Sequence, residues 1–325
     1  MISLLISVLP TILYLLILKA LDSFALARFK LVLRNMLIGF LWCAAAFILT
    51  NPVCLGIPVA AGDVSFMPLI EEILKGSILA WLIFRRKFRF MAQCLIYGAA
   101  VGSGFSLLEN IIYFYFNPEM AFGTALVRGF GCAILHMGCT ALFATILLLA
   151  REKSGKVPAT LIAILPSVSI HFLHNWSLEN GIVNPMVALV LIVVVFIGLF
   201  IFLFTFGERK IRQWMDRSIN NDILALSSIR SGNFSSTKPG QYLLGVKEQF
   251  EPEVFFDMLC YVRLAMELRI DKQSEMLMRQ AGFSNDETGN RHAERSAKKA
   301  EMKALAGHIG KTGMLVLAPL TRDDI

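Results

Sequence analysis

Long apolar stretches fill the first two thirds of the sequence and restrict the folds open to it. Seven of them are long enough to cross a bilayer, because a hydrocarbon core about 30 Å thick needs roughly 20 apolar residues per helix. They cover residues 2–18, 35–60, 64–84, 90–116, 125–150, 157–176 and 185–206. Charged residues make up only 17% of the chain, against about 25% in a typical soluble domain. The sequence therefore predicts an all-α, polytopic membrane protein with about seven transmembrane helices.

The last part of the chain, residues 207–325, is far more polar and predicts a mostly helical tail outside the bilayer. Apolar residues at helical spacing predict helices over 252–280 and 291–306, with Gly307 as a stop signal and residues 231–240 as a linker. The net charge of +7 does not indicate a nucleic-acid partner, because no basic stripe is interleaved with aromatic residues. We expect two domains, 1–206 in the membrane and 207–325 beside it.

Every second loop between the expected spans is rich in Lys and Arg, and this alternation predicts the orientation of the spans. The links after the first, third, fifth and seventh spans are basic, as in Arg85-Arg86-Lys87, whereas the other links are nearly free of basic residues. Positively charged loops stay on the cytoplasmic side. We therefore expect the N-terminus outside and the C-terminus in the cytoplasm.

Charged residues inside the third span are the first candidates for a functional site, because charges are costly at membrane depth. The motif is Glu71-Glu72-x-x-Lys75, and its spacing lets the lysine pair with either glutamate along one helix. An internal ion pair would be a purely structural explanation. Two carboxylates against one lysine, however, leave a surplus negative group that a structural pair does not need.

The next three spans add more polar side chains at a similar depth: Glu109 and Asn110, then His136, then His171, His174 and Asn175. His171 and Asn175 share a helix face at i, i+4, whereas His174 points to another side. At 1.5 Å per residue, the glutamates, His136 and His171 fall into one layer toward the outer ends of their spans. Scattered packing residues would have no reason to coincide in this way.

Carboxylates and imidazoles in a dry pocket suit hydrolysis of a peptide bond. Glu71 would activate water, with Lys75 holding it anionic, and Glu72 or Glu109 would hold the neighbouring proton. The residues expected to stabilise the oxyanion and to aid departure of the amine are His136, His171 and Asn175. The same residue types would also hold Zn²⁺, with Glu109, His136 and His171 as ligands. Because no HExxH or similar metal signature is present, the sequence favours a metal-free, glutamic mechanism.

These motifs together resemble the PrsW family of bacterial intramembrane proteases, related to the CAAX-processing and Abi proteases. The resemblance rests on Glu71-Glu72-x-x-Lys75, Gly-Phe-x-x-x-Glu109-Asn110-x-x-Tyr113, the span-borne His136 and His171-x-x-x-Asn175. Asn175 stands where many members have an aspartate. The resemblance implies cleavage of a single-span membrane protein near the outer face of the bacterial inner membrane, with an anti-sigma factor as one such substrate. The family is described both as glutamic and as metallo-type.

A proton- or metal-coupled transporter is the alternative from another class, because membrane carboxylates and histidines also serve as relays. Transporters tend to bind their cargo at the midplane, between inverted repeats. The outward position of the polar layer and the lack of an internal repeat in the sequence favour the protease.

Overall fold

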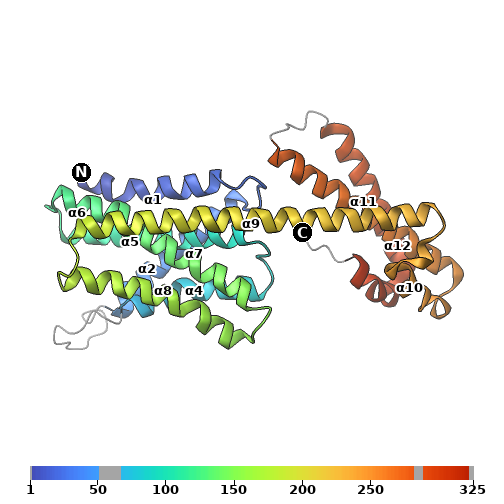
Figure 1. Ribbon diagram of the computed structural model, residues 1–325, viewed down its shortest axis with the longest axis horizontal. Helices are drawn as coiled ribbons and strands as arrows, with labels where there is room; N and C mark the ends of the chain where they lie inside the picture. Colours follow the sequence, from blue (N-terminus) through green and yellow to red (C-terminus); the bar gives the residue numbers. More distant parts are fainter. Residues whose placement is uncertain (1, 51–66, 282–287, 322–325) are drawn as a thin grey trace. The chain divides into compact units, whose positions relative to one another are not determined.

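The computed structural model describes residues 2–50, 67–281 and 288–321, and these residues form helices joined by short links without any strand (Figure 1). The chain divides into two compact units, Met1–Arg209 and Lys210–Ile325. The predicted all-α membrane fold is confirmed, and the protein is a multi-pass membrane protein.

The first unit is a helical bundle. Its helices are α1 (Ile2–Ala20), α2 (Phe29–Thr50), α4 (Met67–Phe84), α5 (Met91–Phe116), α6 (Phe122–Leu126), α7 (Ala133–Ala150), α8 (Lys156–Glu179) and the start of α9 (Pro185–Arg230), with a π-helical turn η2 (Val127–Cys132) joining α6 to α7. Among the described residues, six helical segments are long and apolar enough to span a membrane. Helix α4 is not one of the six, because its 18 residues include two glutamates and a lysine.

Several predicted span limits need correction. The second span was expected at 35–60, whereas α2 begins earlier, at Phe29; the expected end falls in residues 51–66, outside the described part of the chain. The last span was expected to end near 206, whereas α9 continues to Arg230. Hydropathy falls at 206, but the following polar residues include good helix formers, so the helix outlasts its apolar part.

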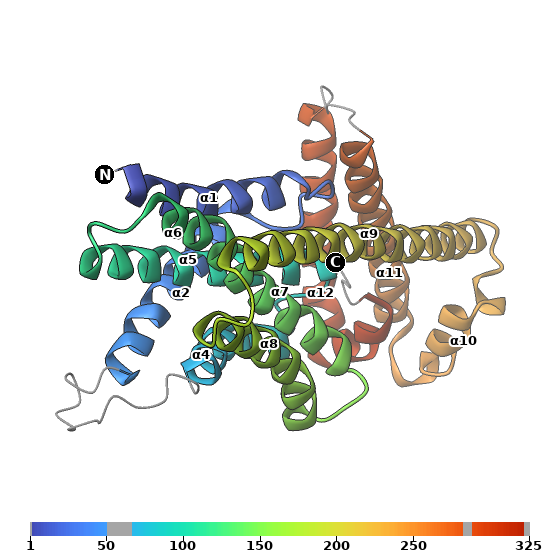
Figure 2. The ribbon, with the colours of Figure 1, turned by 60° about the vertical axis from the view of Figure 1, so that its left-hand side comes forward.

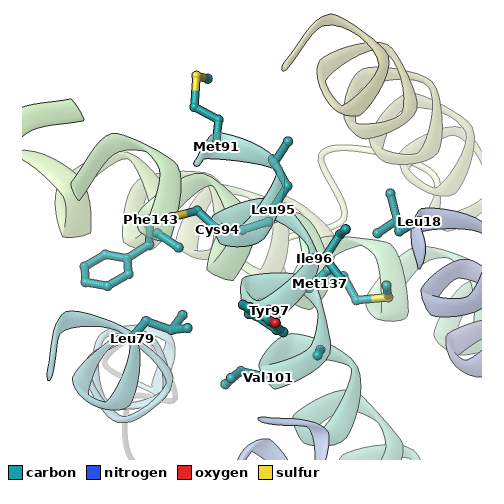
Figure 3. Packing of buried hydrophobic residues seen from close by; sticks show 14 of the residues in the cluster. Leu18, Leu79, Met91, Cys94, Leu95, Ile96, Tyr97, Val101, Met137 and Phe143 are labelled. Atoms are coloured by element: carbon teal, nitrogen blue, oxygen red, sulfur yellow. The ribbon is translucent and has the colours of Figure 1, made fainter. Parts of the chain in front are cut away.

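Helices α5 and α7 form the centre of the bundle. In the apolar windows of α5 and of the α6–α7 segment, 83% and 78% of residues are buried, against 28% in each of the other four spans. Helix α5 packs between α2 and α7, and α7 also contacts α8 and α4 (Figures 1 and 2). Side chains from both central helices meet in the apolar core, among them Leu95, Ile96 and Met137 (Figure 3).

Small residues let α5 and α7 approach closely beside the polar layer. A Cβ atom on Gly102 would lie 2.4 Å from the carbonyl oxygen of His136, and one on Gly98 would lie 2.7 Å from the Cα of Ala141. No side chain fits at these distances. The two glycines therefore fix how far α7, and with it His136, stands from α5.

The second unit has a core of its own. It contains the end of α9, the 3-10 turns η3 (Phe234–Ser236) and η4 (Lys247–Gln249), and helices α10 (Lys238–Leu244), α11 (Pro252–Gln280) and α12 (Thr288–Thr321). Its buried residues include Met258, Val262 and Leu317. Arg269 of α11 donates two hydrogen bonds to Asp222 of α9, at 2.8 and 3.0 Å.

Two tail predictions were wrong in detail, while the helix over 252–280 is confirmed. Gly307 does not stop the last helix, which runs on to a break at Gly310, where φ is +70°. Glycine tolerates a helical φ as well as a positive one, so its presence alone does not end a helix. The expected linker at 231–240 already contains η3 and the start of α10, whose N-cap is Thr237.

Candidate active site

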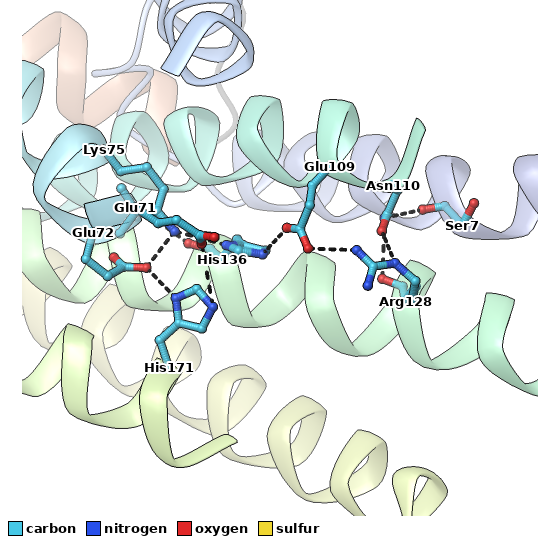
Figure 4. Close-up of polar contacts among 10 residues, drawn as sticks. Ser7, Glu71, Glu72, Lys75, Glu109, Asn110, Arg128, His136 and His171 are labelled. Atoms are coloured by element: carbon cyan, nitrogen blue, oxygen red, sulfur yellow. Dashed lines mark hydrogen bonds and ion pairs between the residues drawn. The ribbon is translucent and has the colours of Figure 1, made fainter. Parts of the chain in front are cut away.

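Four helices bring five ionisable side chains of the polar layer together inside the first unit (Figure 4). They are Glu71 and Glu72 on α4, Glu109 on α5, His136 on α7 and His171 on α8. Glu72, His136 and His171 are buried, and the other two are half-buried. The sequence-based expectation that these groups share one layer matches their positions.

Glu72 is the best-bonded carboxylate of the cluster. Its Oε1 atom accepts hydrogen bonds from Nζ of Lys75 at 2.5 Å and from Nδ1 of His171 at 2.9 Å. Lys75 is fully buried and also lies 2.9 Å from Nδ1 of His136, with Nζ 4.5 Å from the centre of the Phe105 ring. The lysine therefore bonds Glu72 and not Glu71, which has no lysine or arginine bonded to it in the described part of the chain.

The two imidazoles stand edge to face, with ring centres 4.8 Å apart and planes at 88°. Their Nε2 atoms face the remaining carboxylates: His171 Nε2 lies 3.8 Å from Oε2 of Glu71, and His136 Nε2 lies 2.6 Å from Oε2 of Glu109. Both carboxylate oxygens are buried, but only Oε2 of Glu71 lacks a close polar partner among the described residues, because Oε2 of Glu109 is paired with His136. Such an atom is expected to have a ligand or a reacting group as its partner.

The cluster fits a divalent metal ion. One ligand atom each from Glu71, His136 and His171 lie within 4.8 Å of one another. Two histidines and a glutamate form the donor set of many catalytic zinc sites, which keep the fourth position open. Glu72 holds Nδ1 of His171, which is how a second carboxylate commonly orients a metal-binding imidazole. The structure thus groups Glu71 with the histidines, where the sequence had named Glu109 as the third ligand.

The ring hydrogen of His136 would lie on different nitrogen atoms in the metal-free and the metal-bound state. When Nδ1 accepts a hydrogen bond from the Lys75 ammonium, Nε2 carries the ring hydrogen and faces Glu109. Metal binding through Nε2 requires that hydrogen to leave, and Nδ1 can then donate toward Lys75 only if Lys75 has given up a proton, because an ammonium group accepts no hydrogen bond. Proton movement between Lys75, His136 and Glu109 would accompany metal binding at this site.

Arg128 completes the site and was missing from the sequence-based list. Its guanidinium donates to Oε1 of Glu109 at 2.7 Å and to Oδ1 of Asn110 at 3.1 Å, and it lies over the Tyr113 ring at 4.0 Å (Figure 4). Asn110 in turn donates to the carbonyl oxygen of Ser7 on α1. Arg128 is on η2, and π-helical turns are frequent at functional sites. The available signal was that Arg128 is a basic residue inside the expected fifth span, near its outer end.

Asn175 is the one predicted site residue that the structure does not connect to the cluster. Its side chain is half-buried and makes no hydrogen bond with the described residues. His174 is also half-buried, and its Nε2 atom is buried without a hydrogen-bond partner among those residues. Neither residue contributes an ion pair or a ligand atom to the cluster.

A comparison with known families decides the class of this protein. The model of one family, described as PrsW family intramembrane metalloprotease, matches residues 27–203. The chain belongs to this family. The PrsW match runs from α2 into the membrane part of α9 and includes every residue of the cluster. No curated protein and no solved structure matches the chain.

Membership in the PrsW family confirms the resemblance inferred from the motifs. The protein is thus an enzyme, an intramembrane protease, and the transporter alternative gains no support.

Proposed function

We propose that this protein is a metal-dependent intramembrane endopeptidase, with Glu71, His136 and His171 as the metal ligands. The observation that carries the proposal is the convergence of these three ligand atoms within 4.8 Å from three different helices. The unbonded Oε2 atom of Glu71 supports it, because burying a carboxylate oxygen without a partner is costly. A Zn²⁺ ion held there would polarise the scissile carbonyl group and favour ionisation of water.

Glu109 is the proposed general base. Arg128 holds one of its oxygens, Oε1, while Oε2 faces the cluster and lies 2.6 Å from Nε2 of His136, a contact that metal binding through Nε2 would release. A carboxylate fixed in this way can take a proton from the attacking water at Oε2 and pass it to the leaving amine. Glu71 was the base expected from the sequence, and its pairing with Lys75 was the reason; that lysine bonds Glu72 instead.

Glu72 and Lys75 act as positioning groups in this proposal. Glu72 fixes the ring of His171, and Lys75 lies between Glu72 and His136. Their charges keep the two imidazoles oriented. Asn175, four residues after His171 on α8, remains the candidate for an oxyanion donor once a substrate is bound.

The proposed substrate is a single-span membrane protein, cut close to the outer face of the bacterial inner membrane. Glu71 and Glu72 lie about one turn from the start of α4, and Glu109 lies two turns from the end of α5. The basic loops, which are expected in the cytoplasm, lie at the opposite ends of these helices. A membrane-anchored anti-sigma factor is a substrate of this kind.

The test combines cleavage with metal analysis on the full chain in liposomes that contain a single-span reporter. We expect about one equivalent of metal in active protein and reversible inhibition by chelators. Glu71→Gln and His171→Ala should lose both metal and cleavage, whereas Glu109→Gln should keep the metal and lose cleavage. His174→Ala is the matched control on α8 and should keep both.

Two outcomes would contradict the proposal. Active protein without metal would restore the glutamic mechanism favoured by the sequence, with Glu71 as the base. Full cleavage by Glu71→Gln would remove this cluster from the reaction altogether.

A further inference from the structure

A second pocket lies at the end of the bundle where the basic loops gather, remote from the Glu71–His171 cluster along α4. It has a volume of about 410 Å³, within the range of ligand-binding pockets. Its lining comes from the link between α1 and α2, the start of α2, the end of α4 and the start of α5. It belongs entirely to the first unit.

The rim of this pocket is cationic. Arg28, Arg34 and Lys87 line it, all three are exposed, and none forms an ion pair with a described residue. No acidic side chain is among the lining residues. Asp22, the nearest acidic group of the α1–α2 link, is already bonded to Lys19 and to the backbone N–H groups of Leu26 and Ala27. Three positive charges thus converge on one cavity, and the described residues place no counter-charge in it.

The floor of the pocket supplies a hydrogen-bond donor among apolar groups. Leu82, Phe88 and Tyr97 are buried there, with the two rings stacked at 4.9 Å. The Tyr97 hydroxyl accepts the backbone N–H of Arg28 at 2.9 Å (Figure 3 shows the ring in its packing). Its own hydrogen has no acceptor among the described residues, so it remains available to an anion in the pocket.

An apolar path leads from the cationic rim along α2. Leu33, Leu37 and Leu41 are spaced four residues apart on one face of α2, beginning beside Arg34, and are 44%, 58% and 56% exposed. Trp81, also a lining residue, is 54% exposed at the end of α4. Tryptophan favours the headgroup region of a bilayer. The surface thus presents cations, then a tryptophan, then an apolar stripe. A phospholipid has its groups in the same order, with a phosphate followed by acyl chains.

We propose that this pocket binds the phosphate headgroup of an anionic phospholipid, whose acyl chains lie along the exposed leucines of α2. Arg28, Arg34 and Lys87 pair with the phosphodiester, and Tyr97 donates its hydroxyl hydrogen to a phosphate oxygen. Basic pockets between transmembrane helices bind anionic headgroups by this chemistry. The proposal does not depend on the metal or on the protease mechanism.

Native mass spectrometry of the full chain with added lipid tests the proposal. We expect retention of phosphatidylglycerol over phosphatidylcholine by the unaltered protein. The triple variant Arg28→Gln/Arg34→Gln/Lys87→Gln should lose most of this preference, at about fivefold for each charge removed. The matched control Lys30→Gln/Arg86→Gln/Lys153→Gln removes three exposed charges that do not line the pocket, from α2, the α4–α5 link and the α7–α8 link, and should keep the preference. Tyr97→Phe keeps the ring and should weaken binding by a smaller factor.

The results that would overturn the proposal are distinct. Equal phosphatidylglycerol binding by the triple and control variants would mean that general basicity, not the pocket, attracts the lipid. Displacement of the lipid by millimolar inorganic phosphate would assign the pocket to a free anion instead. Unchanged thermal unfolding of both triple variants in detergent shows that neither result comes from misfolding.

Discussion

At the scale of single residues, the site depends on how a few buried charges share their partners. Glu72 takes the bonds of both Lys75 and His171, which leaves Glu71 and Glu109 to face the two Nε2 atoms. In a low-dielectric interior, the choice of partner decides which carboxylate is structural and which is free to react. Adjacent glutamates in the sequence therefore have different partners.

Arg128→Gln should lower cleavage on the order of 10–100-fold without loss of metal. The reason is that Arg128 fixes Oε1 of Glu109, and groups that orient reacting or ligating side chains contribute about this much. Turnover and metal content are measured on the same sample. Arg128→Lys keeps the charge but not the paired donors to Glu109 and Asn110. Its cleavage rate should lie between those of the unaltered protein and Arg128→Gln. Loss of metal in Arg128→Gln would instead make Glu109 a ligand.

Lys75→Met should destabilise the protein by about 3–5 kcal/mol, because it leaves the carboxylate of Glu72 buried without its cation. The double variant Glu72→Gln/Lys75→Met removes both charges and should regain most of the lost stability while remaining poorly active. Thermal unfolding in detergent and cleavage give the two readouts. Equal stability of the single and double variants would mean that the pair is not coupled.

At the scale of elements, the close contact of α5 with α7 determines where His136 stands. The two helices are the most buried of the bundle, and glycine at 98 and 102 allows their backbones to touch. Helix α8 and the short α4 also pack against α7, and they add His171 and the pair Glu71 and Glu72. The polar cluster is thus placed by backbone contacts that involve no charge.

Gly102→Ala should cost about 1–3 kcal/mol and displace His136, because the new methyl group would lie 2.4 Å from the His136 carbonyl oxygen. Cleavage should fall more than stability, since the ligands lose their geometry. Gly198→Ala on α9 meets no atom within 4 Å and is the matched control. An active, fully stable Gly102→Ala protein would show that α7 can shift without affecting the site. Unfolding temperature and metal content are the measurements.

At the scale of the whole molecule, the chain combines a membrane protease unit with a polar unit that has its own apolar core. The family match ends at residue 203, so it covers only the first of the two. The described residues of the second unit carry no cluster of metal-ligating side chains. The proposed active site lies in the first unit, within the residues that the family model matches.

The orientation of the chain is the prediction that belongs to this scale. We expect the N-terminus outside and residues 207–325 in the cytoplasm, because the basic residues gather in alternate loops. Cysteine labelling with a membrane-impermeant reagent should reach a cysteine placed at Glu119 but not one placed at Ser154 in intact cells. The opposite pattern would put the proteolytic site near the cytoplasmic face.

Much of this protein follows from its sequence alone. The apolar runs determined the membrane fold, because each helix must satisfy its own backbone hydrogen bonds in the bilayer. Regular helical rise also placed Glu71, Glu72, Glu109, His136 and His171 in one layer. These are local properties, since they depend only on residues near in sequence.

The tertiary structure decided which partner each buried charge takes. That Lys75 bonds Glu72, that Glu71 joins the histidines, and that Arg128 holds Glu109 depend on how four helices rotate and approach one another. Helix rotation is set by packing, including the contact at Gly102, and a single sequence does not contain these distances. Depth in the membrane is therefore readable from the sequence, whereas pairing within the site requires the packed bundle.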